Sequence, residues 1–241
     1  LTVEPQAQRD HLPCCFVLLE EAAPVILPRR SALVLAAAVA ASALSACAYN
    51  EALGRNQLLL VDNAALSQQS LAWERVTIGL VDDRCVESFD PNSNAKLVGE
   101  NLLVGDAFAA TFQPLFDPEL GVEKSAEWAN GSAERPDVVV LGLGGDGHTA
   151  SLFPGSPQLE QGLSANAPAV LAAEPTMEPM VTRLTYSGPF LATSPHVFLH
   201  FEGAGKRGVY EEARSKDAPS LMPVSWFLHH PECPVETYWA P

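Results

Sequence analysis

Short apolar runs alternate along the chain with stretches in which hydrophobic residues recur at helical spacing. The strongest run lies within 137–143, where a continuous, largely β-branched stretch predicts a buried strand. Shorter runs predict further strands at 16–19, 58–61, 76–81, 170–173, 183–186 and 196–201. Helices are expected over 31–53, 64–71, 95–103, 121–130 and 206–214, with shorter ones at 148–152 and 189–193. Strands that alternate with helices indicate an α/β fold, with a mostly parallel sheet flanked by helices on both faces in a Rossmann-like three-layer arrangement.

The first part of the chain has a different character from the rest. Residues 1–30 contain several prolines and show no clear hydrophobic period, which predicts an irregular lead-in before a single α/β domain at 31–241. The segment 29-RRSALVLAAAVAASALSACAYN-50 imitates a lipoprotein signal, with a basic start, an apolar middle and small residues before Cys47. Its distance from the start of the chain and its alanine content favour a buried helix instead, so we expect a cytoplasmic protein.

The charge balance limits the class of partner. The chain carries 14 Lys+Arg against 29 Asp+Glu, a formal net charge of −15. Such a surface repels nucleic-acid phosphates and anionic lipids, so we expect neither nucleic acid nor a membrane as partner. A small anionic substrate requires a local cluster of basic residues. The five cysteines form no CxxC pair or Cys/His metal spacing, which favours reduced thiols and no metal site.

Polar clusters follow three of the predicted strands. They are 82-DDR-84, 144-GGDGH-148 and 203-GAGK-206. Ligands in open α/β sheets bind beyond the carboxyl ends of the strands. The sequence therefore predicts one shared pocket built from these three clusters.

The Asp146-Gly147-His148 stretch is the main candidate for chemistry. A histidine in this place can act as general base near neutral pH, and Asp146 could orient its imidazole or contact substrate hydroxyls. Gly144, Gly145 and Gly147 allow close approach of the backbone to a ligand. The alternative is a plain turn with an exposed histidine. The stretch is neither a P-loop nor a dinucleotide-binding GxGxxG motif.

Three basic residues are candidates for binding a phosphate or carboxylate. Arg84 could clamp an anion with its forked guanidinium, or it could form an ion pair with Asp82 or Asp83. Lys206 lies at a glycine-rich turn between a strand and a helix, where backbone amides also attract anions. Arg183 opens the strand at 183–186. For Arg183 and Lys206 the alternative is an ordinary structural or solvated side chain.

These clusters, in this order, resemble the 6-phosphogluconolactonase family of the glucosamine-6-phosphate isomerase/deaminase superfamily. The resemblance runs from about residue 31 to the end of the chain. It rests on the stretches 142-GLGGDGHTASLFPGS-156, 81-VDDRCV-86, 91-PNSN-94, 183-RLT-185, 203-GAGK-206, 224-VSWFL-228 and 237-TYWAP-241.

The resemblance implies hydrolysis of a six-carbon sugar δ-lactone that carries a 6-phosphate, a step of the pentose phosphate pathway, without metal or organic cofactor. His148 matches the family's catalytic histidine, which would deprotonate water, and Asp146 would support it. Arg84, Arg183 and Lys206 match positions that bind the phosphate or nearby negative charge. The deaminase branch has a glutamate in its pattern DGHxAFNEP where this chain has Phe153, which favours lactone hydrolysis over deamination.

The family also has a second glycine-rich loop, Ser-Gly-Gly-(Ser/Arg)-(Thr/Ser)-Pro, after its first strand. This chain reads 58-LLLVDNAALSQQSLAWERV-76 there, without the loop and with Asp62 near the place of the phosphate donors. Two alternatives to an active lactonase therefore stay open. One is an inactive homologue that binds sugar phosphates. The other is an enzyme on a different substrate, such as a deaminase or a hydrolase of unphosphorylated lactones.

Overall fold

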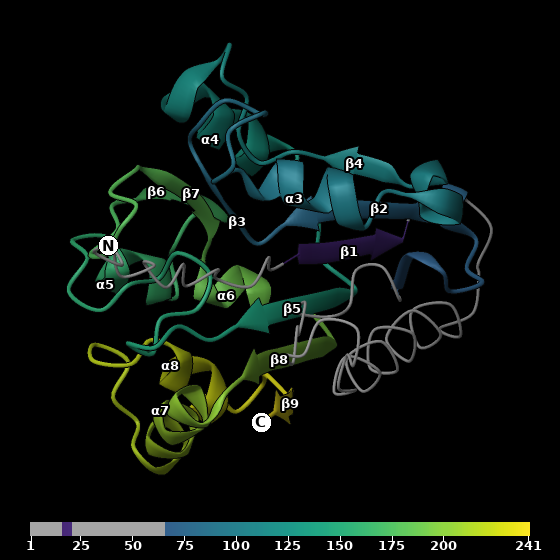
Figure 1. Ribbon diagram of the computed structural model, residues 1–241. Coiled ribbons are helices and arrows are strands. Elements are labelled where there is room, and N and C mark those ends of the chain that lie inside the picture. Colours follow the sequence, from purple (N-terminus) through teal and green to yellow (C-terminus); the bar gives the residue numbers. More distant parts are fainter. Residues whose placement is uncertain (1–15, 21–65) are drawn as a thin grey trace, which may run out of the picture.

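A six-stranded sheet forms the centre of the molecule in a computed structural model that describes residues 16–20 and 66–241 (Figure 1). The strand order is β4-β2-β1-β5-β8-β9. A second, three-stranded sheet has the order β3-β7-β6. The strands are β1 (Phe16–Glu20), β2 (Val76–Leu80), β3 (Asp82–Arg84), β4 (Thr111–Gln113), β5 (Val138–Gly142), β6 (Val170–Ala173), β7 (Arg183–Tyr186), β8 (His196–Glu202) and β9 (Val235–Ala240).

Strand direction in the large sheet places the predicted clusters at one edge. β2–β4, β5–β8 and β8–β9 are parallel pairs, whereas β1 runs antiparallel to both β2 and β5 (Figure 1). Two strands that are both antiparallel to β1 run in the same direction as each other. The carboxyl ends of β2, β5 and β8 therefore share an edge, as the polar clusters led us to expect.

The expected α/β class is confirmed, and the small sheet differs from a parallel arrangement in strand direction, as β1 does in the large sheet. The small sheet is wholly antiparallel: β3 pairs with β7, and β7 pairs with β6. It continues from the end of β2, because β3 begins two residues after β2 ends. The small sheet therefore carries Arg84 and Arg183 to the same edge.

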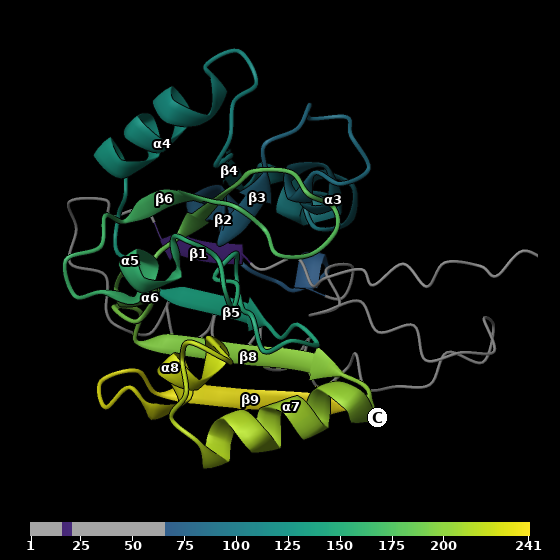
Figure 2. The same ribbon diagram turned by 90° about the vertical axis from the view of Figure 1, so that its left-hand side faces the viewer.

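Helices cover both faces of the large sheet. Alternate residues of β5 point to opposite faces, so Val138 and Val140 join one hydrophobic core and Val139 and Leu141 the other. α3 and α4 contribute to the first core, and α7 and α8 to the second, where Figures 1 and 2 show them beside β8 and β9. The helices are α3 (Asn94–Asn101), α4 (Gly121–Gly131), α5 (Leu159–Leu163), α6 (Gly188–Leu191), α7 (Ala204–Ser215) and α8 (Val224–His229), with 3₁₀ turns η1 (Trp73–Arg75) and η2 (Gly105–Ala109).

Most element predictions that fall on described residues are confirmed to within a few positions. Ser93 caps α3 as expected, since its hydroxyl oxygen accepts a hydrogen bond from the Lys96 backbone N–H at 3.2 Å. The helix predicted at 31–53 and the strand at 58–61 lie outside the described residues, and so does Asp62. The domain boundary predicted at residue 31 stays a prediction, although β1 lies within the proposed lead-in. Among the described residues, every helix is too short or too polar to cross a membrane.

Candidate active site

The loop after β5 folds back on itself around Gly144. The Gly144 N–H donates to the His148 carbonyl at 2.9 Å, and the Gly147 N–H donates to the Gly144 carbonyl at 3.1 Å. A Cβ atom on Gly144 would lie 2.2 Å from the His148 ring and 2.8 Å from the Asp146 carboxylate. The close turn therefore requires glycine at this position.

The His148 side chain is buried in this turn, with only 1% of its surface exposed. The alternative of a turn with an exposed histidine is therefore wrong. Its Nδ1 atom makes a short contact with the Asp146 carboxylate, which also accepts from the His148 backbone N–H at 3.1 Å. Burial raises the pKa of Asp146, but the hydrogen bonds and charge of His148 outweigh burial and lower it overall.

This contact assigns different roles to the two imidazole nitrogens. An ionised carboxylate can only accept, so in the neutral ring Nδ1 carries the proton and Nε2 keeps its lone pair. Nε2 is buried and has no hydrogen-bond partner in the described part of the chain. A buried nitrogen of this kind can take a proton from a water molecule that enters the site.

Phe153 connects the histidine to Arg183. The Phe153 ring is tilted against the His148 ring, with centroids 4.6 Å apart, and the Arg183 guanidinium carbon lies 4.9 Å from the Phe153 centroid. Phe153 is fully buried and Arg183 is 1% exposed. The three side chains therefore form a continuous buried stack.

The two arginines lie opposite each other across the small sheet, because Arg84 and Arg183 are paired residues of β3 and β7. The Arg84 guanidinium donates to the Asn92 carbonyl at 3.1 Å and to the Asn94 side-chain oxygen at 2.6 Å. Among the described residues it forms no ion pair with Asp82 or Asp83, so that alternative is wrong. The pKa of Arg183 is lowered, mainly by burial and also by the charge of Arg84. The charges of Asp82 and Asp83 act in the opposite direction.

Lys206 lies in the first turn of α7, after β8 and the positive-φ residue Gly203. Since β8 is parallel to β5, Lys206 is at the same edge of the sheet as the loop that carries His148. The Glu202 carboxylate lies near it: burial raises the pKa of Glu202, and the charge of Lys206 lowers it. Direct contacts thus join His148, Asp146 and Phe153 to Arg183. Arg84 lies next to Arg183 because the two are paired in the register of β3 and β7. Lys206 lies at the same edge of the sheet because β8 is parallel to β5.

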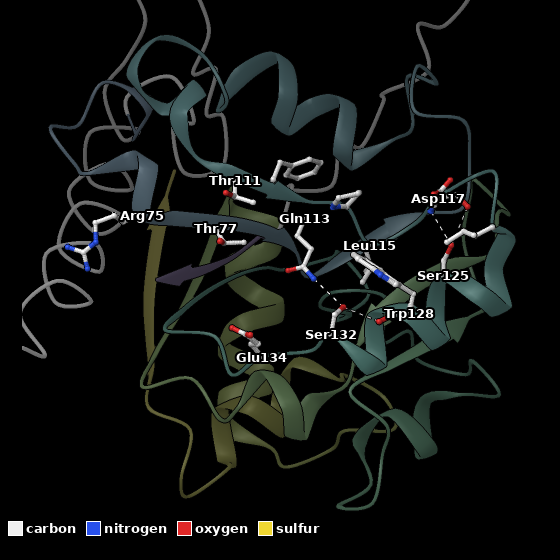
Figure 3. Close-up of a pocket in the computed structure, with 13 residues that line it drawn as sticks. Arg75, Thr77, Thr111, Gln113, Leu115, Asp117, Ser125, Trp128, Ser132 and Glu134 are labelled. Atoms are coloured by element: carbon white, nitrogen blue, oxygen red, sulfur yellow. Dashed lines mark hydrogen bonds between the residues drawn. The ribbon is translucent and has the colours of Figure 1, made fainter. Parts of the chain in front are cut away.

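A large cavity lies elsewhere in the molecule. It has a volume of about 1130 Å³ and opens between β2, β4 and α4, where Thr77, Gln113 and Trp128 line it (Figure 3). The Gln113 amide donates to the Ser132 hydroxyl at 3.3 Å across its floor. None of the described residues that line the cavity belongs to the candidate site, so the two places are separate. Within the described ranges, no group of three or more His, Cys, Asp or Glu side chains gathers as metal ligands.

The comparisons with known proteins identify the family of this chain. The family model described as glucosamine-6-phosphate isomerases/6-phosphogluconolactonase matches residues 54–239. The chain belongs to this family. It is 40% identical over 184 residues to the 6-phosphogluconolactonase of Rhizobium meliloti (strain 1021), covering 73% of this chain and 78% of that protein.

Other members of the family agree in sequence and in fold. The 6-phosphogluconolactonase of Helicobacter pylori (strain J99) is 34% identical, covering 78% of this chain and 81% of that protein. The crystal structure of a 6-phosphogluconolactonase from Shewanella baltica superposes with a TM-score of 0.72 at 33% identity, covering 89% of this chain and 95% of the other. A putative 6-phosphogluconolactonase from Neisseria gonorrhoeae has a TM-score of 0.74 at 29% identity, covering 88% and 95% of the two chains.

Sequence reasoning missed part of the loop that carries His148. The short helix predicted at 148–152 is wrong, because Ala150 has a φ of +50° and Thr149 forms a bridge with Leu152. It also missed that Ser151 reaches the Asp82 carboxylate, 69 positions away in sequence. The only signal was the pair of acids that precedes Arg84, which we interpreted solely as its possible ion-pair partners.

Proposed function

We propose that this chain hydrolyses 6-phospho-D-glucono-1,5-lactone to 6-phosphogluconate, in the oxidative pentose phosphate pathway, with His148 as general base. The observation that carries the proposal is the buried His148 ring, whose Nδ1 meets Asp146 while Nε2 keeps a free lone pair. Membership of the family and the names of its relatives support the substrate.

The reaction needs one group that takes a proton from water and later gives it to the departing ring oxygen. His148 Nε2 accepts a proton from water as the water oxygen bonds to the lactone carbonyl carbon. The tetrahedral intermediate then breaks its bond between that carbon and the ring oxygen, and the ring oxygen takes the proton from Nε2. Asp146 stabilises the imidazolium that exists between the two steps, because its carboxylate faces Nδ1.

The arginine pair supports a phosphate-bearing substrate. Like charges opposite each other on one face of an antiparallel pair repel, so an anion that binds between Arg84 and Arg183 relieves this cost. In this proposal Lys206 adds a third positive charge from the end of β8, and Gly144, Gly145 and Gly147 let the backbone approach the sugar. The cluster supplies the local positive charge that a chain of net charge −15 otherwise lacks.

Phe153 supports lactone hydrolysis over deamination. The deaminase pattern requires a glutamate in this position, beside the histidine. Here the position holds a fully buried aromatic ring in contact with His148. A ring of this kind can neither accept nor donate the additional proton that isomerisation and deamination need.

The cytoplasmic location expected from the sequence is part of this proposal, and the two described cysteines fit it. Among the described residues Cys85 and Cys233 are both free thiols. Reduced thiols are the usual state in the cytoplasm.

The test is acid release from freshly prepared 6-phosphogluconolactone by the wild-type chain and His148→Ala, measured above spontaneous hydrolysis. Loss of a general base typically lowers kcat by about 100- to 10,000-fold, and we expect a loss in this range. His196→Ala is the matched control, since it removes a partly exposed imidazole at the amino end of β8.

The outcomes separate the alternatives. A wild-type rate equal to the spontaneous rate would overturn the proposal and leave the sugar-phosphate-binding homologue or an enzyme on a different substrate. Equal kcat/KM on the phosphorylated and unphosphorylated lactones would point to the substrate alternative, in which the chain does not recognise phosphate. Full activity of His148→Ala would remove the histidine from the mechanism.

A further inference from the structure

A buried hydrogen-bonded contact ties the histidine loop to the small sheet. The Ser151 hydroxyl donates to Asp82 Oδ2 at 2.6 Å, and the Ser151 backbone N–H donates to Thr185 Oγ1 at 3.2 Å. Ser151 is 1% exposed, Asp82 5% and Thr185 not at all. Asp82 and Thr185 are paired residues of β3 and β7, so Ser151 is held by both strands at one point.

The loop needs this support because it contains a residue in an unfavourable conformation. Ala150 has a φ of +50°, in the left-handed region that non-glycine residues rarely adopt. Such a conformation persists only where the surrounding structure determines it. On one side of Ala150 the His148 carbonyl is held by the Gly144 N–H at 2.9 Å, and on the other side Ser151 is held by Asp82 and Thr185.

The position of the imidazole depends on the same turn. His148 precedes Ala150 by two residues and Phe153 follows by three, and their rings pack against each other with centroids 4.6 Å apart. A shift of the turn at Ser151 would move Phe153 relative to His148. It would also move Phe153 relative to Arg183, whose guanidinium lies 4.9 Å from its centroid.

We propose that Ser151 and Asp82 are positioning residues, whose hydroxyl–carboxylate pair fixes the His148 imidazole relative to the arginines that hold the substrate phosphate. The inference rests on the proposed lactone hydrolysis, because it concerns the geometry of that reaction. Neither residue needs to touch the substrate. Their effect appears in kcat, since a displaced base slows proton transfer even when the lactone is bound normally.

The first variant is Ser151→Ala, which removes the hydroxyl without adding volume. We expect kcat to fall on the order of 10- to 100-fold with KM within about threefold of wild type. Ser194→Ala is the matched control: Ser194 is 2% exposed and its hydroxyl donates to the Asp137 carbonyl at 3.1 Å, at the opposite end of β8. The control loses a buried, hydrogen-bonded hydroxyl too, so a similar fall in melting temperature with unchanged kcat is expected for it.

Further variants identify the partner of the hydroxyl. Asp82→Asn keeps an oxygen that can accept from Ser151 and should retain kcat within about threefold, whereas Asp82→Ala should lose as much as Ser151→Ala. The double variant Ser151→Ala/Asp82→Ala should be no slower than either single variant, since both remove one interaction. If Ser151→Ala does not fold, Ser151→Cys is nearly isosteric with a weaker donor, and its kcat should also fall severalfold.

The results distinguish this inference from the proposed function. A wild-type chain without lactonase activity overturns the function, and the positioning role with it. An active wild type with Ser151→Ala or Ser151→Cys within twofold of Ser194→Ala overturns the positioning role alone. Losses that multiply in the double variant also overturn it, because they would show that Ser151 and Asp82 act independently.

Discussion

Gly144→Ala tests whether the fold of the loop sets the position of the catalytic base. The added Cβ would lie 2.2 Å from the His148 Cε1 and Nδ1 atoms, whereas ordinary contact begins at about 3.4 Å. The ring must therefore move by about 1.2 Å, the difference between these two distances. The same methyl group would lie 2.8 Å from Asp146 Oδ1, so the carboxylate cannot simply follow the ring.

The expected loss follows from this displacement. A misplacement of about 1 Å in an active site can cost about 100-fold in rate, and we expect kcat of Gly144→Ala to fall by at least that factor. Overpacking of this kind costs about 1–3 kcal/mol of stability, so the variant should still fold. The assay is lactone hydrolysis above the spontaneous rate, together with the midpoint of urea unfolding.

Gly131→Ala provides the control for adding a methyl group to the fold. Gly131 ends α4, where a Cβ would meet no atom within 4 Å. We expect it to keep wild-type kcat. If Gly144→Ala retained more than a third of the activity of this control, the imidazole would tolerate the displacement, and our account of the loop would be refuted.

Two further predictions concern stability. Gly147→Ala should destabilise the fold by about 1–3 kcal/mol in urea unfolding. Gly147 has a φ of +84°, and an added Cβ would lie 2.8 Å from Met222 Cγ. Gly155→Ala is the control, because Gly155 has a φ of +76° but open space around it, and its free energy of unfolding should fall less. Burial raises the pKa of Asp83 from 3.8 to about 6, more than its hydrogen bond from Asn94 lowers it. A raised pKa means that the folded state holds the proton more tightly than the unfolded state. The contribution of the protonated Asp83 to stability is therefore complete below pH 3.8 and is lost as pH rises through about 6. At about 1.4 kcal/mol for each pH unit, the stability of wild type relative to Asp83→Asn should fall by about 2.5 kcal/mol between pH 4 and pH 7, and a constant difference would contradict this.

The sequence was most informative where one local signal determined the structure. The β-branched run around Val140 could only be a buried strand, and β5 forms there. Ser93 combines a capping side chain with a following helical stretch, and it caps α3. The polar clusters at strand ends also predicted that Arg84, His148 and Lys206 lie at one edge of the sheet, and the strand directions place them there.

Other features depend on contacts that a local pattern does not contain. A short apolar run such as the one in β1 carries no sign of its direction, and β1 lies antiparallel between β2 and β5. The residues after His148 have an ordinary helical composition, yet Ser151 bonds to Asp82 and Thr185 from distant parts of the chain. Because those bonds are tertiary, the helix expected at 148–152 does not form.

The two acids before Arg84 explain how an acidic chain can present a cationic site. In sequence, Asp82 and Asp83 stand where they would neutralise Arg84. In the fold, Asp83 accepts hydrogen bonds from the Arg84 and Asn94 backbone N–H groups at 2.8 and 2.7 Å, at the start of α3. Asp82 accepts a hydrogen bond from the Ser151 hydroxyl, and burial lowers the pKa of Arg183 more than the charge of Asp82 raises it. Both carboxylates are thus bonded to the start of α3 and to the histidine loop, which leaves the two arginines available for the anion in our proposal.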